Sequence, residues 1–227
     1  WTAGNVRDIV EAYEAALPPG GCPNWVLGNH DRPRIATALG PSMARLATML
    51  LLTLRGVPTW YYGDEIGMLD GDVPPERRLD PATLRQPDQP QESRDPERTP
   101  MQWDNTPFGG FSPVEPWLPV QDFASRNAAA QEDDPRSQWR LVQRLLQVRQ
   151  EEPDLLLGAY RSLPSDDPIY SYTRGGRWGV TLNFADEPRT VDLPQEVVPH
   201  LSSFLDQTPT RTRVLSLRPH EGVLWKI

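Results

Sequence analysis

The stretch Trp25-Val26-Leu27-Gly28-Asn29-His30-Asp31-Arg32-Pro33-Arg34 decides how the rest of the chain is interpreted. Its apolar half follows Pro23 and ends at Gly28, and a short apolar run with such bounds predicts a buried strand. Amide, imidazole, carboxylate and guanidinium groups then follow within six positions. In α/β barrels the reacting groups lie at the carboxyl ends of the strands, because the loops there converge on one mouth. The stretch therefore predicts a barrel strand that delivers polar side chains to a site.

The composition excludes two classes of partner. The 227 residues carry a net charge of −8, and an acidic chain without a basic run is a poor match for nucleic acid. The longest apolar run, Met49-Leu50-Leu51-Leu52, is far shorter than the roughly 18 residues of a membrane span, so no membrane contact is expected.

The single cysteine, Cys22, excludes an internal disulfide framework and favours a reducing, cytoplasmic compartment. Because the chain starts with Trp1 rather than Met, we expect a piece of a longer polypeptide.

The first quarter of the chain has the pattern of an α/β fold. Apolar residues recur at helical spacing over 5–17 and 43–54, which predicts two helices. Strands are predicted over 24–28 and 58–63, the second of them rich in β-forming residues. Helix, strand, helix and strand with short connections indicate that the two strands are parallel.

The pattern is lost between residues 63 and 135. Of the 26 prolines, 12 lie between Pro58 and Pro119, whereas average usage is about 5% of residues. A loop this long inside a compact domain is expected only where it forms the rim of an active site. Helical spacing returns over 136–149.

The last part of the chain alternates short apolar segments with turns. Gly175-Gly176 is a hairpin signal between the first two of these segments. Strands are predicted over 169–172, 179–184, 190–193, 212–215 and 222–225. We interpret residues 153–227 as an all-β antiparallel sandwich domain.

The length decides how much of a barrel is present. A complete (β/α)8 TIM barrel takes about 250 residues, and only two barrel strands are predicted here. We therefore interpret residues 1–152, including the long loop 63–135, as the last part of such a barrel. The fold class is α/β, with the remainder of the barrel expected upstream of Trp1.

Two stretches at the ends of the predicted strands resemble regions of a known enzyme family. Asn29-His30-Asp31 after an apolar strand, with Arg34 three residues on, resembles the fourth conserved region of the α-amylase family of glycoside hydrolases, family 13. Gly56-x-Pro58 followed by Gly63-x-Glu65 resembles the eighth-strand region of the same family.

The long loop narrows the resemblance to one branch of that family. Arg94-Asp95, the run Arg98-Thr99-Pro100-Met101-Gln102-Trp103-Asp104 and then Phe111-Ser112 are similar to the α-glucosidase branch rather than to true amylases. That branch includes oligo-1,6-glucosidases, maltases, sucrose isomerases and trehalose synthases. The resemblance implies a retaining enzyme that hydrolyses, transfers or isomerises α-linked glucosyl oligosaccharides or disaccharides.

The resemblance also implies roles for five residues. Asp31 is the carboxylate that stabilises the transition state, and His30 donates a hydrogen bond to the same sugar. Arg94 is the first choice for a guanidinium at that sugar and Arg98 the second, while Arg34 lines the neighbouring sugar site. The nucleophile and the acid/base belong to the fourth and fifth barrel strands, which this chain does not contain, so the chain alone is expected to be inactive. No cofactor and no metal ion are expected.

Simpler structural interpretations compete with these roles. Asn29-His30-Asp31 also fits a turn that caps the segment after it, since Asn and Asp favour such positions. Glu65 fits a carboxylate stabilised by a helix dipole. Arg94 and Arg98 stand among acidic residues with which they could pair at the surface; these are Asp88, Glu92, Asp95 and Glu97. Three aromatic residues fit either sugar stacking or a small core that anchors the loop; these are Trp103, Phe108 and Phe111.

Three classes of function follow from the sequence. The first is the carboxyl-terminal part of an α-glucosidase-like enzyme. The second is a non-catalytic relative that acts as a partner subunit, resembling the heavy chains of amino-acid transporters, and the intact His30 and Asp31 favour the enzyme over it. The third is a sugar-binding module built on the sandwich, which is the weakest because the sandwich has no exposed row of aromatic residues.

Overall fold

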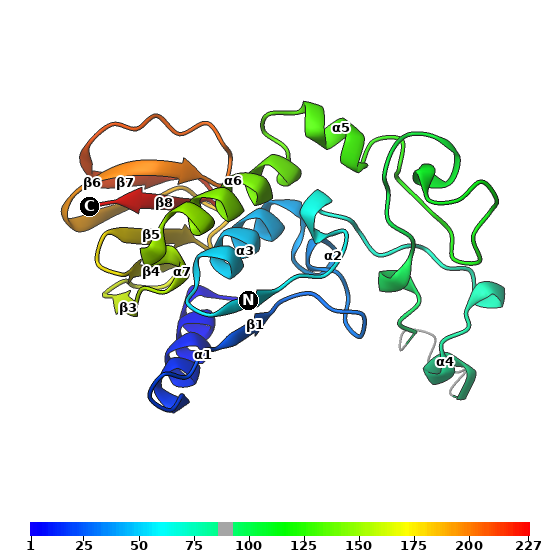
Figure 1. Cartoon of the computed structure of the whole chain (residues 1–227), viewed down its shortest axis with the longest axis horizontal. Coiled ribbons are helices and arrows are strands. Elements are labelled where there is room, and N and C mark those ends of the chain that lie inside the picture. The colour runs from blue at the N-terminus through cyan, green and yellow to red at the C-terminus, as the bar shows by residue number, and fades with distance from the viewer. Residues whose placement is uncertain (86–92) are drawn as a thin grey trace. The chain divides into compact units, whose positions relative to one another are not determined.

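The computed structural model describes residues 1–85 and 93–227, shown in Figure 1. Its contacts divide the chain into two units. The first, here called the barrel–sheet unit, consists of residues 1–26, 42–59 and 141–227. The second, here called the loop unit, consists of residues 27–41 and 60–140. The predicted domain boundary between residues 152 and 153 stays a prediction, because the two units divide the chain in a different way.

The barrel–sheet unit starts with the predicted alternation of helix and strand. Its elements are α1 (Ala3–Ala16), β1 (Asn24–Val26), α3 (Pro41–Thr53) and β2 (Val57–Thr59). The two strands pair in parallel, with Trp25 opposite Pro58. Helix α3 is buried over almost its whole length, as its apolar sequence indicates. Parallel pairing of consecutive strands across a helix is the repeating unit of a (β/α)8 barrel, so the predicted barrel segment is confirmed.

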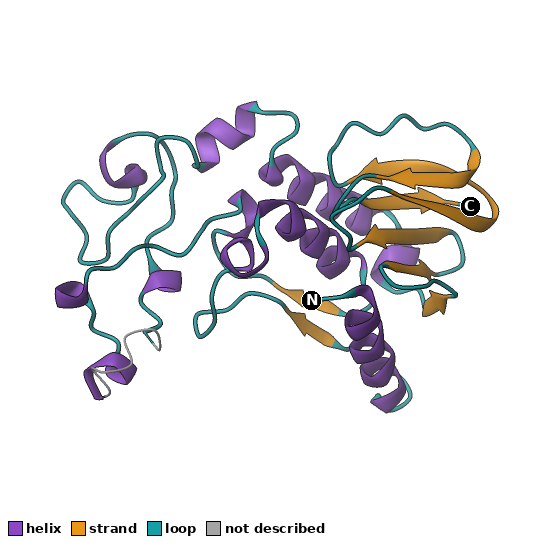
Figure 2. Ribbon diagram, turned by 180° about the vertical axis from the view of Figure 1, so that it is seen from behind, coloured by secondary structure: helices purple, strands orange, loops and turns teal. Residues whose placement is uncertain are grey.

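A second helix holds the carboxyl end of α3. In α6 (Gln138–Glu151) the buried Arg149 donates to Leu52 O at 2.9 Å, Leu54 O at 2.9 Å and Gly56 O at 2.5 Å. The last carbonyls of a helix lack partners within it, so these contacts satisfy groups that would otherwise be buried without a donor. Figure 2 shows α3 and α6 side by side.

The carboxyl-terminal part is a six-stranded antiparallel sheet with strand order β3-β4-β5-β8-β6-β7. Its strands are β3 (Tyr160–Leu163), β4 (Ile169–Arg174), β5 (Trp178–Asn183), β6 (Arg189–Ser202), β7 (Thr212–Leu217) and β8 (Gly222–Lys226), preceded by the short helix α7 (Pro153–Leu156). The predicted antiparallel β-domain is confirmed. Strand β6 is much longer than predicted, because it continues past two prolines through two shifts of register. Strand β3, which has no β-branched residue, was not predicted.

The loop unit is built from short helical turns rather than from regular layers. Its elements are α2 (Ile35–Leu39), η1 (Asp64–Ile66), η2 (Pro75–Arg77), α4 (Pro81–Arg85), η4 (Pro96–Arg98), η5 (Pro107–Gly110) and α5 (Ala128–Asp133). A small core of Ile66, Met68 and Met101 holds it together, with Trp139 packed against it. The predicted irregular loop is therefore an ordered part of the fold.

Within the two ranges that the structure describes, no helix is both long enough and apolar enough to cross a lipid bilayer.

Candidate active site

The polar half of the opening stretch forms a turn directly after β1. The side-chain oxygen of Asn29 accepts a hydrogen bond from the backbone N–H of Asp31 at 2.8 Å, which closes the turn. The turn does not cap the next helix, because the residue before α2 is Arg34 and its side chain makes no capping bond. The stretch is thus a turn, as the simpler interpretation predicts, but the cap that this interpretation also predicts is absent.

At the start of this turn, the Asp64 side chain approaches Gly28 closely. A Cβ atom at this position would lie 2.3 Å from Oδ2 of Asp64, the first residue of η1. The backbone of Gly28 does not have a positive φ. A larger residue here would displace the end of the Asp64 side chain, so glycine is favoured for space rather than for conformational freedom.

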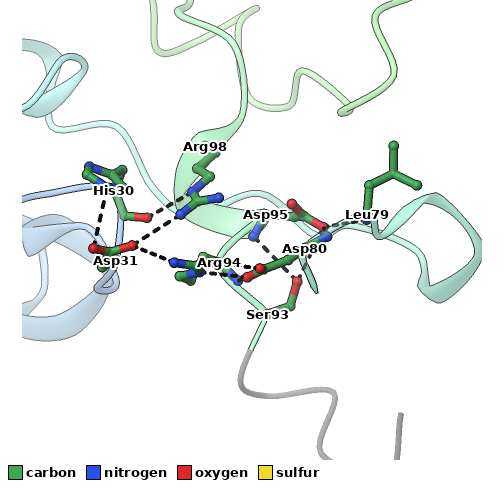
Figure 3. A network of polar contacts seen from close by, with 8 residues as sticks. All are labelled: His30, Asp31, Leu79, Asp80, Ser93, Arg94, Asp95 and Arg98. Carbon is green, nitrogen blue, oxygen red and sulfur yellow. Dashed lines mark hydrogen bonds and ion pairs between the residues drawn. The ribbon is translucent and has the colours of Figure 1, made fainter. Parts of the chain in front are cut away.

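Four of the five predicted site residues come together around the Asp31 carboxylate, as Figure 3 shows. Oδ1 of Asp31 accepts from Arg94 Nη1 at 2.9 Å and from Arg98 Nη2 at 3.1 Å. His30 Nε2 lies 3.4 Å from the other oxygen, Oδ2. Arg98 also donates from Nε to His30 O at 2.9 Å, which ties it to the turn. The Asp31 side chain is half exposed, so a ligand can reach it.

These cations keep the central carboxylate ionised. The hydrogen bond from Arg94 is the largest of several effects that lower the pKa of Asp31 below its usual range, and the charges of His30 and Arg98 add to it. A fixed, ionised carboxylate at an accessible position can accept hydrogen bonds from the hydroxyl groups of a neutral ligand.

Asp80 holds Arg94 in place, and the sequence did not indicate it. Its side chain is fully buried and forms a two-point contact with the guanidinium, from Arg94 Nε at 2.9 Å and from Arg94 Nη2 at 2.7 Å. The backbone N–H of Arg94 also donates to Asp80. Asp95 in turn accepts from the backbone N–H groups of Leu79 and Asp80. Arg94 is therefore a bridge between a buried carboxylate and an exposed one.

The alternative of pairing with nearby acids is wrong for two of its candidates. Asp95 binds backbone groups and Ser93, and buried Glu97 makes no ion pair with Arg94 or Arg98 within the described residues. Asp88 and Glu92 lie outside the residues that the structure describes.

The predicted role of Arg34 is wrong. The Arg34 side chain is fully buried, so it cannot line a sugar site. Any additional residues of the protein could only cover this side chain further. The guanidinium donates to Tyr62 O at 2.5 Å and lies 4.9 Å and 4.7 Å from the ring centres of Tyr61 and Tyr62. Its backbone N–H donates to Asp70. Arg34 stabilises the loop after β2 through cation–π contacts.

Glu65 lies in the first turn of η1, and Trp60 Nε1 donates to Glu65 Oε2 at 3.1 Å, a contact that the sequence did not indicate. Over the stretches 1–85 and 93–227, no group of three His, Cys, Asp or Glu side chains is placed to hold a metal ion.

Asp64 gives the loop unit a pH dependence. Burial raises the pKa of its carboxyl group to about 7, with Glu65 and Asp70 adding to the rise and Arg34 opposing it. An unfolded Asp titrates near 3.9, so between about pH 4 and pH 7 only the folded state holds the proton. The free energy of unfolding should therefore fall across that range, by up to about 1.4 kcal/mol per pH unit, and level off above it.

The measurement is the melting temperature of the protein and of its Asp64→Asn variant from pH 4.5 to 8. Asparagine cannot ionise, so the variant should gain on the wild type as the pH rises to about 7. A constant difference between the two across this range would show that Asp64 titrates normally.

A comparison with protein families decides the membership of the chain. The model of the α-amylase catalytic domain matches residues 2–158, which is more than half of the sequence. The chain belongs to the α-amylase family. Its two parallel strands and the turn that carries Asp31 lie within the matched region.

Individual relatives of this α-amylase family chain agree with that result. A salivary α-glucosidase of Anopheles gambiae is 35% identical over 96% of the chain, which spans 40% of that protein. The mouse amino acid transporter heavy chain SLC3A1 is 31% identical over 96% of the chain and 33% of its own length. The solved structure of the trehalulose synthase MutB from Pseudomonas mesoacidophila matches the whole chain at 28% identity with a TM-score of 0.87, over 47% of its length. The chain thus spans less than half of the relatives that it matches.

Proposed function

We propose that this chain is the carboxyl-terminal part of a retaining α-glucosidase-like glycoside hydrolase that acts on α-linked glucosyl oligosaccharides or disaccharides. The observation that supports the proposal most is the half-exposed Asp31 carboxylate, ionised by two guanidiniums and flanked by His30. The rest of the barrel, upstream of Trp1, completes the enzyme. The proposed location is cytoplasmic.

The proposed role of Asp31 follows from the chemistry of the reaction. Retaining glycosidases place a nucleophile and an acid/base about 5 to 5.5 Å apart around an oxocarbenium-like transition state. As positive charge develops on the ring, its hydroxyls become more acidic and donate more strongly to a fixed carboxylate. Asp31 would then bind the transition state better than the substrate, which is the only kind of binding that raises kcat. His30 would hold the same sugar.

Two acidic side chains near β2 are not assigned to the missing catalytic roles. Asp64 is largely enclosed by protein and crowds Gly28, and Glu65 accepts from Trp60. The proposed nucleophile and acid/base remain those of the fourth and fifth barrel strands, outside this chain.

A partner subunit is the second candidate, since a transporter heavy chain is among the relatives. A subunit that performs no catalysis has no need of an accessible carboxylate held by a buried Asp80 and two arginines. This arrangement supports the enzyme. The third candidate is a sugar-binding module formed by the sheet. No contact among the described residues of the sheet supports this candidate.

The test compares the full-length protein with residues 1–227 alone. We expect the full-length protein to release nitrophenol from p-nitrophenyl α-glucoside and to form α-glucose first, as a retaining enzyme does. The fragment should show no turnover above the buffer rate, because it lacks the nucleophile and the acid/base. It should also melt without a sharp transition, since β1 and β2 expose Val26 and Val57 and pair only with each other among the described strands.

Two results would contradict these expectations. A full-length protein that cleaves no α-glucoside would remove the proposed function and favour the partner subunit. Turnover by the purified fragment would mean that the catalytic carboxylates lie within residues 1–227 after all.

A further inference from the structure

The guanidinium of Arg94 lies between two carboxylates and donates to both, as Figure 3 shows. It has five N–H donors in one plane, of which Nε and Nη2 donate to Asp80 while Nη1 donates to Asp31 Oδ1. Because the group is rigid and planar, the two bonds along its Asp80 edge fix the direction of Nη1. The orientation of the Asp31 carboxylate therefore depends, through Arg94, on Asp80.

The Asp80 carboxylate is itself held rigidly by the loop unit. Its side chain is 0% exposed, and it also accepts from the backbone N–H of Arg94 at 2.7 Å. The backbone N–H of Asp80 donates to Asp95 at 3.0 Å, and its carbonyl accepts from Leu84 in α4. This burial is complete within the residues that the structure describes, so it does not depend on the rest of the protein.

Asp80 also changes the charge around Asp31. Arg94 and Arg98 place two positive groups on one oxygen of the Asp31 carboxylate. By themselves these two groups would repel a ligand that carries a positive charge. Asp80 adds a negative charge that is shielded from water and bound to Arg94 at two points, and such charge-assisted pairs are strong. Asp80 therefore offsets the charge of Arg94 and leaves that of Asp31 available to a cation.

From this geometry we infer that Asp80 is a positioning residue for the reaction. Acting through Arg94, it holds the Asp31 carboxylate in one orientation and keeps its surroundings favourable to positive charge. The inference rests on the proposed function, because the positive charge is that of the oxocarbenium-like transition state. It assigns a part in catalysis to a fully buried residue that does not touch the sugar.

The kinetic test uses the full-length protein with Asp80→Asn, which keeps the shape of the side chain and removes its charge. With p-nitrophenyl α-glucoside, kcat should fall about tenfold or more, because a displaced catalytic group is costly. KM should change less than about threefold, since the loss concerns the transition state rather than the bound substrate. The matched control is Glu115→Gln, because Glu115 pairs with Arg77 in the same unit, and it should keep the wild-type kcat.

A double variant shows whether Asp80 acts through Asp31. In the Asp31→Asn background the carboxylate that Asp80 positions is gone, so adding Asp80→Asn should lower kcat by no more than about twofold further. A residue that only stabilised the loop unit would cause the same relative loss in both backgrounds.

A binding measurement keeps the inference separate from the proposed function. Calorimetry compares glucose, which is neutral, with 1-deoxynojirimycin, a glucose-shaped amine that is protonated at mildly acidic pH. In Asp80→Asn the Kd of the amine should rise about tenfold, whereas that of glucose should rise less than about threefold, because only the amine meets the unbalanced positive charge. Asp80→Glu keeps the charge and should keep the wild-type ratio of the two Kd values.

This readout does not depend on turnover. The expected Kd changes in a wild type that cleaves no α-glucoside would support Asp80 as the partner of Arg94 at a sugar site while removing the enzyme. Normal turnover with unchanged kcat and Kd values in Asp80→Asn would leave the enzyme and overturn the inference.

Three further results would overturn the inference. The first is an equal weakening of glucose and the amine in Asp80→Asn together with a lower melting temperature, which would give Asp80 a structural role alone. The second is a full additional loss of kcat in the Asp31→Asn background. The third is the absence of binding of either compound to the wild type.

Discussion

Replacing Asp31 by asparagine in the full-length protein is expected to lower kcat by roughly 10² to 10³ and to leave the fold intact. Removing one preorganised electrostatic partner of the transition state typically costs about 2.7 to 4 kcal/mol. Asparagine keeps the shape of the side chain and loses its charge. It also presents an amide to the guanidiniums of Arg94 and Arg98, which now hold the carboxylate at 2.9 and 3.1 Å.

The measurement is kcat and the melting temperature of Asp31→Asn beside those of His30→Ala. The histidine variant should lose less activity, because a water molecule can replace part of a donor but cannot replace a fixed negative charge. Melting temperatures close to that of the wild type would show that both effects concern catalysis. If Asp31→Asn keeps more than about a tenth of the wild-type kcat, Asp31 does not stabilise the transition state.

Replacing Arg149 by leucine is expected to have the largest effect on stability. The buried guanidinium donates to three carbonyl groups at and after the carboxyl end of α3, namely those of Leu52, Leu54 and Gly56. Leucine fills similar space and leaves these acceptors without a donor, at about 1 to 3 kcal/mol for each unsatisfied group. Burial also lowers the pKa of Arg149, so part of that cost is offset when the cation is removed.

We therefore expect the free energy of unfolding to fall by about 3 kcal/mol, and the melting temperature of the full-length protein to fall by several degrees. Calorimetry of Arg149→Leu and of the control Arg144→Leu measures this. Arg144 lies on the exposed side of the same helix, and its replacement should change stability by no more than about 0.5 kcal/mol. Equal melting temperatures for the two variants would show that the carbonyl contacts contribute little.

Local patterns predicted the parts of the site that lie next to each other in the sequence. The apolar run 25–27 and Gly28 indicate a strand that ends in a polar turn, and the structure has that turn. The apolar sequence of α3 likewise predicts a buried helix. The α/β fold class was predicted from the order of helices and strands. The partial barrel was predicted because the chain is too short, and has too few predicted parallel strands, for a complete one.

Other features depend on contacts that no local pattern encodes. Asp80 precedes a short helix and looks like an ordinary cap, and its pairing with Arg94 appears only once the loop unit has folded. Arg34 was expected to line the neighbouring sugar site, as the family resemblance implies, whereas Tyr61 and Tyr62 provide a buried place for it. For β6 the sequence predicted only the strand 190–193, and the shifts of register allow the strand to continue past two prolines.

The two oxygens of the Asp31 carboxylate are not equivalent. An ionised carboxylate has about four lone-pair positions, and those of Oδ1 are taken by Arg94 and Arg98. Within the described residues, Oδ2 has only the His30 ring near it, at 3.4 Å. The lone pairs that have no donor among the described residues therefore belong to Oδ2. The two arginines fix the directions of these lone pairs, because they hold the carboxylate in one orientation. A ligand must bring its hydroxyls to that single atom, so stereoisomers of a sugar that differ at one hydroxyl would be separated by direction rather than by charge.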